Sequence, residues 1–272
     1  MYRQAHVRGA AWILALPRAK SNKMSATAHR EQPSLSGQVA LITGAGRGIG
    51  RAIALRLARA DIALVLAART ESQLTETARL ARQLGVQALP LPTDLTRDEQ
   101  TKALVTTALE RFGHLDIVVN NAGGGPPRTP VIKARPTDWD ATLRTNLWAT
   151  MLVSKLVLPA MLAQGRGTII NICSQAGLTG RAGEAAYAAA KFGVRGFSQA
   201  LLEEVREKGI TVSTIYPGYV DTAMIPHNKR LQRHKMLSPD DVAEAVYQVV
   251  GSPPRCCPVE LVLQPQHDPL RA

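Results

Sequence analysis

Residues 39–50 read Val-Ala-Leu-Ile-Thr-Gly-Ala-Gly-Arg-Gly-Ile-Gly, and this stretch decides the fold. Its first five residues are small, aliphatic or β-branched, as in a buried strand, whereas Ile49, Ile53 and Leu57 recur at the spacing of one helix face. Four glycines fall within seven positions where the two patterns meet. They let a turn tighten, and they let the backbone approach a pyrophosphate whose charge is met by free N–H groups at the start of the helix. The order of strand, glycine-rich turn and helix predicts a dinucleotide site rather than a flexible turn.

The same alternation of strands and helices continues along the chain. Strict alternation requires crossover connections, which place the strands in parallel and put helices on both faces of the sheet. The fold class is therefore α/β, a doubly wound parallel sheet of about seven strands in one domain over residues 37–265. The expected strands are 39–43, 62–67, 86–91, 117–120, 168–173, 211–216 and 259–263, and the expected helices after the first are 71–84, 97–112, 137–164, 183–208 and 239–250.

The excess of positive charge is concentrated before this domain. The chain has 33 basic and 21 acidic residues, but residues 1–30 carry six basic residues and no acidic one, which leaves 27 basic and 21 acidic residues in the rest. So mild a charge argues against a nucleic-acid partner. We interpret residues 1–36 as a leader that is disordered or that precedes a true start at Met24, with a mitochondrial transit peptide and a secretory signal as alternatives. Residues 266–272 form a tail.

The composition argues against a membrane span, a disulfide framework and a metal site. No apolar run approaches the roughly 20 residues of a membrane-spanning helix. Three cysteines, of which Cys256 and Cys257 are adjacent, fit a reducing compartment. The six histidines are scattered, and no H-E-x-x-H or C-x-x-C motif occurs, so we expect no metal. We expect a cytoplasmic protein, or one of the mitochondrial matrix if the leader is a transit peptide.

Tyr187 and Lys191 form a Y-x-x-x-K pattern within an expected helix. Residues four apart lie on one face of a helix, so the ammonium group can lie near the phenol. A cation at that distance favours the ionised form of a phenol, which makes the phenol a usable acid or base near neutral pH. Such pairs also occur on exposed helices without any catalytic role. The glycine-rich turn, together with Ser174 thirteen residues before the tyrosine, favours the catalytic interpretation.

Further motifs follow the glycine-rich turn in a fixed order. The turn itself reads T-G-x-x-x-G-x-G, and Tyr187 and Lys191 have the spacing given above. In this combination the chain resembles the short-chain dehydrogenase/reductase family, in a form similar to the 3-oxoacyl-carrier-protein reductases. The resemblance implies a Rossmann fold and hydride transfer between a nicotinamide cofactor and a carbonyl compound or secondary alcohol. The motifs that carry it are Gly44, Gly48 and Gly50, then Asp94, Asn120-Asn121-Ala122-Gly123, Asn146, Ser174, Tyr187, Lys191, and Tyr216-Pro217-Gly218 with Thr222.

The resemblance assigns four catalytic residues. Tyr187 would donate a proton to the substrate carbonyl, and Ser174 would hold the same oxygen. Lys191 would favour the phenolate and bind the nicotinamide ribose, whereas Asn146 would hold a water that relays protons to the lysine. A helix-interior asparagine satisfied by local hydrogen bonds is the alternative for Asn146. The residues expected to bind the cofactor are Gly44, Arg47, Gly48, Ile49, Gly50, Arg69, Asp94, Leu95, Asn120, Ala122, Gly123, Tyr187, Lys191, Pro217, Gly218, Val220 and Thr222.

The charge at the end of the second strand indicates which cofactor binds. NAD sites offer an acidic residue to the ribose 2′-hydroxyl, whereas NADP sites need cations for the 2′-phosphate. Here Ala68 and Arg69 end the strand, and Arg47 lies in the glycine-rich turn. We interpret Glu71 as a favourable charge in the first turn of a helix rather than as a ribose ligand. We therefore expect NADP(H).

Three features depart from the family pattern. Asp61 follows the first helix where a glycine is usual, so we expect a left-handed backbone there. Cys173 stands where serine is common, and we expect it to be a buried residue that faces away from Ser174. Residues 259–265 lack the glycine pair of many relatives, so the resemblance is weak in this segment.

The segment between Thr222 and Ser238 lies where the family places its substrate lid. It is a solvated charged loop, or else it steers an anionic substrate or an acidic carrier protein toward the site. Residues 123–127 would form another rim, and we interpret Trp139 and Trp148 as packing or subunit contacts. The basic and titratable residues of the lid segment are His227, Lys229, Arg230, Arg233, His234 and Lys235.

Together these features predict an NADP(H)-dependent carbonyl reductase or alcohol dehydrogenase, with a 3-oxoacyl thioester as a specific candidate substrate. A catalytically silent nucleotide sensor or scaffold of the same fold is the alternative, although the expected serine, tyrosine and lysine are all present. The expected partners are a small carbonyl or alcohol substrate, an acidic acyl carrier as a further candidate, and copies of the same chain in a dimer or tetramer. We expect neither a nucleic acid nor a membrane as partner.

Overall fold

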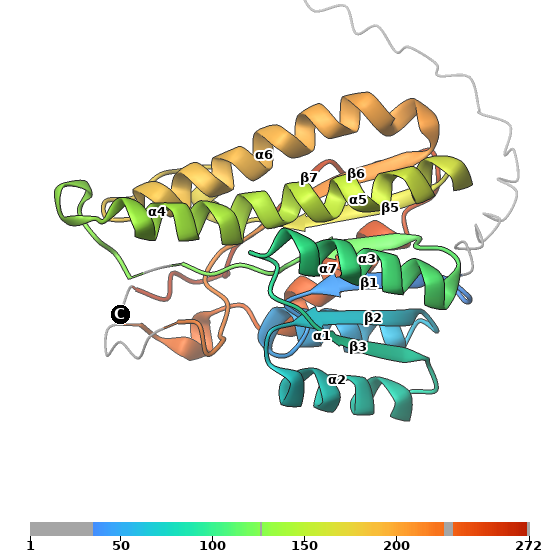
Figure 1. Ribbon diagram of the computed structural model, residues 1–272. Coiled ribbons are helices and arrows are strands. Elements are labelled where there is room, and N and C mark those ends of the chain that lie inside the picture. The colour runs from blue at the N-terminus through green and yellow to red at the C-terminus, as the bar shows by residue number, and fades with distance from the viewer. Residues whose placement is uncertain (1–34, 126, 226–230, 271–272) are drawn as a thin grey trace, which may run out of the picture. The chain divides into compact units, whose positions relative to one another are not determined.

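The computed structural model describes residues 35–125, 127–225 and 231–270, and their strands form one seven-stranded sheet (Figure 1). The strands are β1 (Val39–Thr43), β2 (Ala63–Ala68), β3 (Ala88–Pro92), β4 (Ile117–Asn120), β5 (Gly167–Ile172), β6 (Ile210–Pro217) and β7 (Glu260–Leu263). Their order is β3-β2-β1-β4-β5-β6-β7, and every neighbouring pair is parallel. The chain thus runs outward from β1 to one edge of the sheet, returns to lay β4 beside β1, and continues to the other edge.

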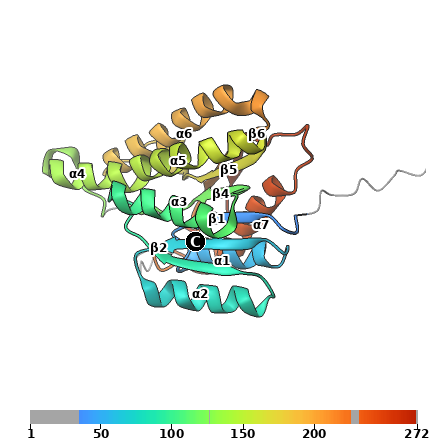
Figure 2. The same ribbon diagram turned by 45° about the vertical axis from the view of Figure 1, so that its right-hand side comes forward.

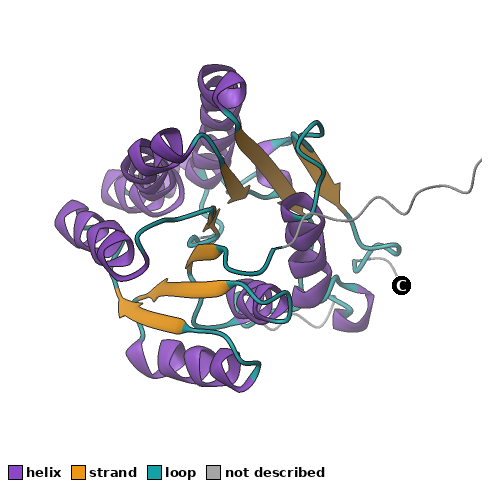
Figure 3. Cartoon of the chain, turned by 90° about the vertical axis from the view of Figure 1, so that its right-hand side faces the viewer, coloured by secondary structure: helices purple, strands orange, loops and turns teal. Residues whose placement is uncertain are grey.

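Helices cover both faces of the sheet (Figure 3). They are α1 (Gly48–Ala58), α2 (Glu71–Gln83), α3 (Asp98–Phe112), α4 (Pro136–Leu143), α5 (Ala149–Gln164), α6 (Ala185–Val205) and α7 (Pro239–Val250). Consecutive residues of β1 face opposite sides, because Ile42 packs with α1, α2 and α7 whereas Leu41 packs with α3, α5 and α6. Both side chains are fully buried, and burial of each contributes about 1.5–3 kcal/mol.

The predicted doubly wound α/β fold is confirmed, and every strand begins and ends within two residues of its predicted bounds. Figure 2 shows α4 and α5 following one another along one helical run. The predicted helix at 137–164 differs from this run in one respect, since a π-helical turn at Arg144–Trp148 separates α4 from α5. A π turn adds one residue to a single turn of helix, a change too small to disturb the apolar periodicity from which the helix was predicted. The predicted helix at 183–208 ends at Val205, and a 3-10 turn, Arg206–Lys208, follows it.

The helical run from Pro136 to Gln164 is long and apolar enough to cross a membrane by length and composition alone. Its buried side chains explain part of that composition. Val153, Val157 and Met161 of α5 are fully buried against β1, β4 and β5. We therefore interpret this run as a core helix of the α/β domain.

The strand order reverses between β1 and β4, and this reversal positions the functional site. Loops that leave the carboxyl ends of two such strands run to opposite sides, and ligands bind there in open α/β sheets. Ile42 of β1 is paired with both Leu66 of β2 and Val119 of β4. The glycine-rich turn therefore leaves the sheet beside the segment that follows β4.

The backbone after α1 and the tail after β7 were both subjects of the sequence-based predictions. Asp61 has φ of 61° and is the one non-glycine residue with positive φ among those described, so the left-handed backbone expected after α1 is confirmed. The tail after β7 contacts the domain, since Pro269 is buried and its carbonyl oxygen accepts a 2.9 Å hydrogen bond from the backbone N–H of Gln232. Gln232 lies within the segment between Thr222 and Ser238, so the tail contacts the predicted lid segment.

Candidate active site

The glycine-rich turn between β1 and α1 is closed so tightly that two of its positions have no room for a side chain. Gly44 has φ of 66°, and a Cβ atom there would lie 2.8 Å from Asn121 Nδ2. A Cβ atom on Gly50 would lie 2.2 Å from the carbonyl oxygen of Gly44. The first turn of α1 therefore packs directly on the loop, and its N-cap residue, Arg47, makes no side-chain cap. The N–H groups of that first turn are those that bind a pyrophosphate in a turn of this kind.

Asn121 and Thr43 tie the glycine-rich turn to the end of β4. The Nδ2 atom of Asn121 donates to the carbonyl oxygens of Thr43 at 3.0 Å and Gly44 at 3.3 Å. The hydroxyl of Thr43 accepts from the backbone N–H groups of Asn121 and Ala122, both at 3.0 Å. Neither Thr43 nor Asn121 is among the residues predicted to bind the cofactor. The signal was their position at the ends of two strands, which becomes informative only once those strands are known to be neighbours.

Asn120, which was predicted to bind the cofactor, has a buried side chain that faces the interior. Its Nδ2 atom donates to Ser154 Oγ at 3.1 Å and to Asn171 Oδ1 at 2.9 Å. Asn171 Nδ2 in turn donates to Ser198 Oγ at 2.8 Å. This network links β4 and β5 to α5 and α6, so the side chain of Asn120 fixes the sheet, and only its backbone lies at the edge where the cofactor is expected.

The loops after β2 and β3 form a cavity of about 250 Å³ lined by Arg69, Pro92, Thr93, Asp94 and Gln100. Arg69 is exposed, and no acidic residue stands beside it at the end of β2. The pKa of the Asp94 carboxyl lies below its ordinary value, chiefly because the Thr96 hydroxyl donates to it at 2.7 Å, with attraction to Arg69 and Arg97 adding to the effect. Leu95, the other predicted residue of this loop, is buried in the core.

Arg51 is a second guanidinium at the glycine-rich turn that the sequence did not single out. Its Nη2 atom donates to the carbonyl oxygen of Gly46 at 2.6 Å, and its Nε atom donates to Thr77 Oγ1 at 3.0 Å. Arg51 therefore extends from α1 and links the turn to Thr77 of α2, whereas the predicted Arg47 is exposed. Ile49, also predicted, is partly buried against the core and anchors the start of α1.

The segment after β6 returns to the glycine-rich turn, as the motif order predicted. The backbone N–H of Gly218 donates to the carbonyl oxygen of Leu263 at 2.8 Å, which holds Pro217 and Gly218 against β7. Thr222 Cγ2 lies 3.4 Å from the position of a Cβ atom on Gly48. Val220 is buried and forms an isolated parallel bridge with residue 237. These predicted residues, distant in sequence from Gly48, are therefore brought to one edge of the sheet.

Lys191 lies beside Tyr187 and at the end of β5, the strand that Ser174 follows. The ammonium group of Lys191 is buried, donates to the carbonyl oxygen of Ile172 at 3.2 Å, and lies 5.8 Å from the centroid of the Tyr187 ring. Ser174 Oγ accepts a hydrogen bond from the backbone N–H of Ala176 at 3.1 Å. That bond uses an acceptor site of the hydroxyl and leaves its proton free to be donated. A phenol, a cation and an oriented hydroxyl are the groups that protonating a carbonyl oxygen requires.

Asn146 lies in the π turn and is almost completely buried. Its Nδ2 atom donates to the carbonyl oxygens of Thr142 and Gly124, both at 3.0 Å, and its Oδ1 atom accepts from the backbone N–H of Gly124 at 3.0 Å. A Cβ atom on Gly123 would lie 2.7 Å from Asn146 Oδ1 and 3.5 Å from Lys191 Nζ. The π turn thus brings Asn146 and the glycines after β4 to the lysine, while the water-holding role of Asn146 stays a prediction.

Cys173 precedes Ser174 and behaves as the sequence predicted. It is buried, and its thiol donates to the carbonyl oxygen of Lys191 at 3.4 Å. Burial raises the pKa of the thiol, which keeps it neutral. The side chain packs with Val194 and Tyr216 behind the site, as strand alternation requires of the neighbour of Ser174.

The predicted lid segment is described in part. His227, Lys229 and Arg230, together with Pro126 of the other rim, lie outside the described residues. Arg233 forms an ion pair with Asp221 and donates to the carbonyl oxygen of Ile225 at 2.7 Å, so its charge is neutralised within the segment. Arg233, His234 and Lys235 form a 3-10 turn within the same segment.

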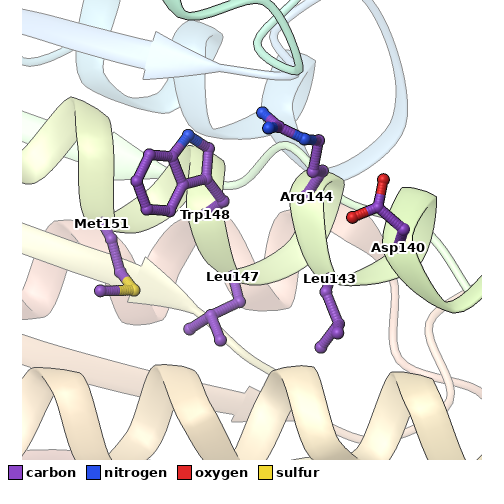
Figure 4. Close-up of a pocket in the computed structure, with 6 residues that line it drawn as sticks. All are labelled: Asp140, Leu143, Arg144, Leu147, Trp148 and Met151. Atoms are coloured by element: carbon purple, nitrogen blue, oxygen red, sulfur yellow. The ribbon is translucent and has the colours of Figure 1, made fainter.

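A second cavity, of about 260 Å³, lies on the run of α4, the π turn and α5 (Figure 4). Figure 4 shows Leu143, Leu147 and Met151 on one side of this helix and Arg144 and Trp148 on the other, with Asp140 completing the lining. Trp148 is 42% exposed and its indole N–H donates to Asp98 Oδ1 at 2.9 Å. The side chain of Trp148 is therefore held against α3, away from the Tyr187 and Lys191 pair.

Comparison with known proteins agrees with this geometry. The family model for short chain dehydrogenases matches residues 38–232. The 3-oxoacyl-[acyl-carrier-protein] reductase FabG of Pseudomonas aeruginosa is 38% identical over 223 residues, which cover 80% of this chain and 90% of the relative.

Among solved structures, a metagenomic short-chain oxidoreductase in complex with NADP is 35% identical with a TM-score of 0.76, covering 86% of this chain and all of its own. An NAD⁺-bound xylitol dehydrogenase is 25% identical with a TM-score of 0.78, covering 85% and 99%. The residues that the family model matches, 38–232, include the glycine-rich turn, Ser174, Tyr187 and Lys191. The chain belongs to the short-chain dehydrogenase family of oxidoreductases.

Proposed function

We propose that the protein is an NADP(H)-dependent reductase of carbonyl compounds that also oxidises the corresponding secondary alcohols. The observation that carries this proposal is that the buried Lys191 ammonium group lies beside the Tyr187 ring and donates to Ile172 at the end of β5, two residues before Ser174. When bound, the nicotinamide supplies or accepts the hydride. The protein's own residues bind the reactants, orient them and move the proton.

Each of the three residues has a distinct task. Tyr187 donates its hydroxyl proton to the substrate oxygen during reduction. Ser174 donates to the same oxygen. Its hydroxyl is oriented for this task, because it accepts a hydrogen bond from the backbone N–H of Ala176 and keeps its own proton for donation. Lys191 gives one of its three donors to the carbonyl oxygen of Ile172, which leaves two for the ribose and for the network around Asn146.

The charges at the far end of the site support NADP(H) over NAD(H). β2 ends in Ala68 and exposed Arg69, and the Asp94 carboxylate across the cavity is engaged by Thr96. A 2′-phosphate would meet Arg69 and Arg47 there, whereas no carboxylate is free at the end of β2 to accept a hydrogen bond from a 2′-hydroxyl. The metagenomic relative was crystallised with NADP, and the xylitol dehydrogenase with NAD⁺, so the fold accommodates either cofactor.

The test is turnover of NADPH with a panel of ketones, aldehydes and acyl thioesters. Tyr187→Phe removes the donated proton and keeps the ring, so kcat/KM should fall far more than about tenfold, or 1.4 kcal/mol, while NADPH affinity stays nearly unchanged. A variant that keeps more than about a tenth of the activity contradicts the role of Tyr187. Binding of NADPH without turnover of any compound would favour a nucleotide sensor or scaffold.

A 3-oxoacyl thioester, free or on an acidic acyl carrier, is a specific candidate substrate. Its support is the reductase of Pseudomonas aeruginosa that is 38% identical. The acyl thioesters of the panel test this candidate directly, because they should then exceed simple ketones in kcat/KM.

For the location of the protein we propose the cytoplasm, which the three free cysteines support.

We also propose that the protein forms a dimer or tetramer. Trp148, Leu143 and Phe192 are large apolar residues that are 42%, 37% and 44% exposed, and they lie on the π turn, α4 and α6, which pack together. An exposed apolar surface of this kind marks an interaction site in many proteins. Sedimentation of the wild type and of a Trp148→Glu variant tests the proposal, since a monomeric wild type contradicts it.

A further inference from the structure

The loop between β5 and α6 carries Arg181, which lies between Ser174 and Tyr187 in the sequence. Its Nη1 atom donates to the hydroxyl of Tyr219 at 3.0 Å, and its Nη2 atom donates to Gln175 Oε1 at a longer 3.4 Å. Gln175 directly follows Ser174, and Tyr219 directly follows Gly218. Arg181 therefore bridges the loops after β5 and β6 on the edge of the sheet where Ser174 lies.

Two other arginines of the loops at this end of the sheet are paired with a carboxylate. Arg128 forms an ion pair with Glu184 at 2.7 Å, and Arg233 forms one with Asp221. The two acceptors of Arg181 are neutral, and in the part of the chain that the structure describes no carboxylate lies within ion-pair distance of it. The positive charge beside Ser174 is therefore not cancelled by these neighbours.

The guanidinium of Arg181 also has free hydrogen-bond donors and a fixed position. A guanidinium has five N–H donors, and the two hydrogen bonds above leave three of them free. The group is held 5.7 Å from the centroid of the Tyr219 ring, and its side chain is exposed. A guanidinium whose position is fixed loses little freedom on binding, and its fork matches the two oxygens of a carboxylate.

We propose that Arg181 binds a carboxylate of the substrate, so that the enzyme reduces oxo acids to hydroxy acids in preference to neutral carbonyl compounds. The inference rests on the proposed function, because it assumes that the reacting carbonyl lies at Ser174 and Tyr187. In the reaction the carbonyl carbon gains a hydride from NADPH and the oxygen gains the Tyr187 proton. The products are the hydroxy acid and NADP⁺, and the carboxylate on Arg181 is unchanged. One unpaired guanidinium matches a singly charged carboxylate better than a dianionic phosphate.

The experiment compares oxo acids of increasing chain length with their own methyl esters, using the full-length protein and NADPH. The esters keep the carbonyl and the carbon chain and lack the charge. The wild type should prefer at least one acid over its ester by about tenfold or more in kcat/KM at low ionic strength, and added salt should weaken the preference. Arg181→Gln should reduce the ratio of acid to ester about tenfold, while kcat/KM for the esters stays within about threefold.

Two further variants separate the causes. Arg181→Lys keeps the charge without the fork, so it should restore part of the preference. Arg255→Gln removes an equal charge from the loop that enters β7 at the opposite edge of the sheet, and it should leave the ratio unchanged. A variant of Arg181 that slows acids and esters equally would assign it a structural role and overturn the proposal.

The failure of this inference and the failure of the proposed function give different results. If ketones and esters are reduced but no acid is preferred, the carboxylate site is wrong and the reductase stands. If the wild type reduces no carbonyl compound, the proposed function is wrong, and calorimetric titration of the same acids into NADP⁺-loaded protein decides the carboxylate site. Binding that Arg181→Gln abolishes supports the site, and the absence of binding overturns it.

Discussion

Replacing Arg69 with alanine should weaken NADPH binding far more than NADH binding. Arg69 lines the cavity of about 250 Å³ between the loops after β2 and β3. A hydrogen bond from a charged donor contributes about 1.5–3 kcal/mol when it is shielded from water. Because Arg69 is exposed, solvent screening reduces this value, and we expect about 1–2 kcal/mol. This corresponds to an increase of about 5- to 30-fold in the Kd of NADPH, with little change for NADH.

The assay is the Kd of each cofactor from protein fluorescence, at low and high ionic strength. Arg97→Ala is the matched control, because Arg97 is also exposed and also attracts Asp94, but it does not line the cavity. Ala68→Asp is the converse variant, since it places a carboxylate where the phosphate would lie and should shift preference toward NADH. Equal losses for NADPH and NADH in Arg69→Ala, or an equal effect of Arg97→Ala, would refute the assignment of Arg69 to the 2′-phosphate.

Three other predictions concern the glycine-rich turn, the last strand of the sheet and residues 1–30. Gly50→Ala should abolish cofactor binding in a titration, because its Cβ atom would lie 2.2 Å from the carbonyl oxygen of Gly44, and a variant that binds NADPH normally would show that the turn can open. The pKa of Glu260 lies below its ordinary value of 4.5, chiefly because Arg195 donates to it. The contribution of the ionised Glu260 to stability is therefore complete above about pH 4.5 and is lost as the pH falls further. The free energy of unfolding should fall less steeply with decreasing pH in Glu260→Gln than in the wild type, and equal slopes would contradict this. Deleting residues 1–30 should leave Tm and turnover unchanged, since they supply no apolar face and no motif residue; a fall of several degrees, equivalent to about 1 kcal/mol, would show that the leader docks on the fold.

The elements and most motif positions were predictable from the sequence because their signals are local. The apolar run of β1, the stripe of Ile53 and Leu57, and the glycines between them each reflect residues within a few positions of one another. The left-handed backbone at Asp61 and the burial of Cys173 also followed from local rules, namely the end of a helix and the alternation of a strand. Each of these features depends on the chain near the residue itself.

The features that were not predicted depend on neighbours far away in the sequence. The bonds of Asn121 to Thr43 cross 78 residues, and the contact of Arg181 with Tyr219 crosses 38. The sequence around Arg51 indicates only an ordinary helix residue, and its hydrogen bonds to Gly46 and Thr77 become known only from the structure. Asn120 shows the same limit in reverse, because its motif suggested a cofactor contact while its side chain is committed to Ser154 and Asn171. Tertiary placement decided all of these roles.

The π turn at Arg144–Trp148 makes the length of this helix part of the site. Removing one residue from the turn would restore regular α-helical hydrogen bonding. Because the π turn accommodates its extra residue within a single turn, α4 and α5 would keep their orientation, and Val153 and Val157 would stay on the sheet. The residues inside the turn would shift instead, so Asn146 would lose its bonds to Gly124. Homologues and engineered variants that keep these bonds should therefore tolerate substitutions in this turn far better than a change in its length.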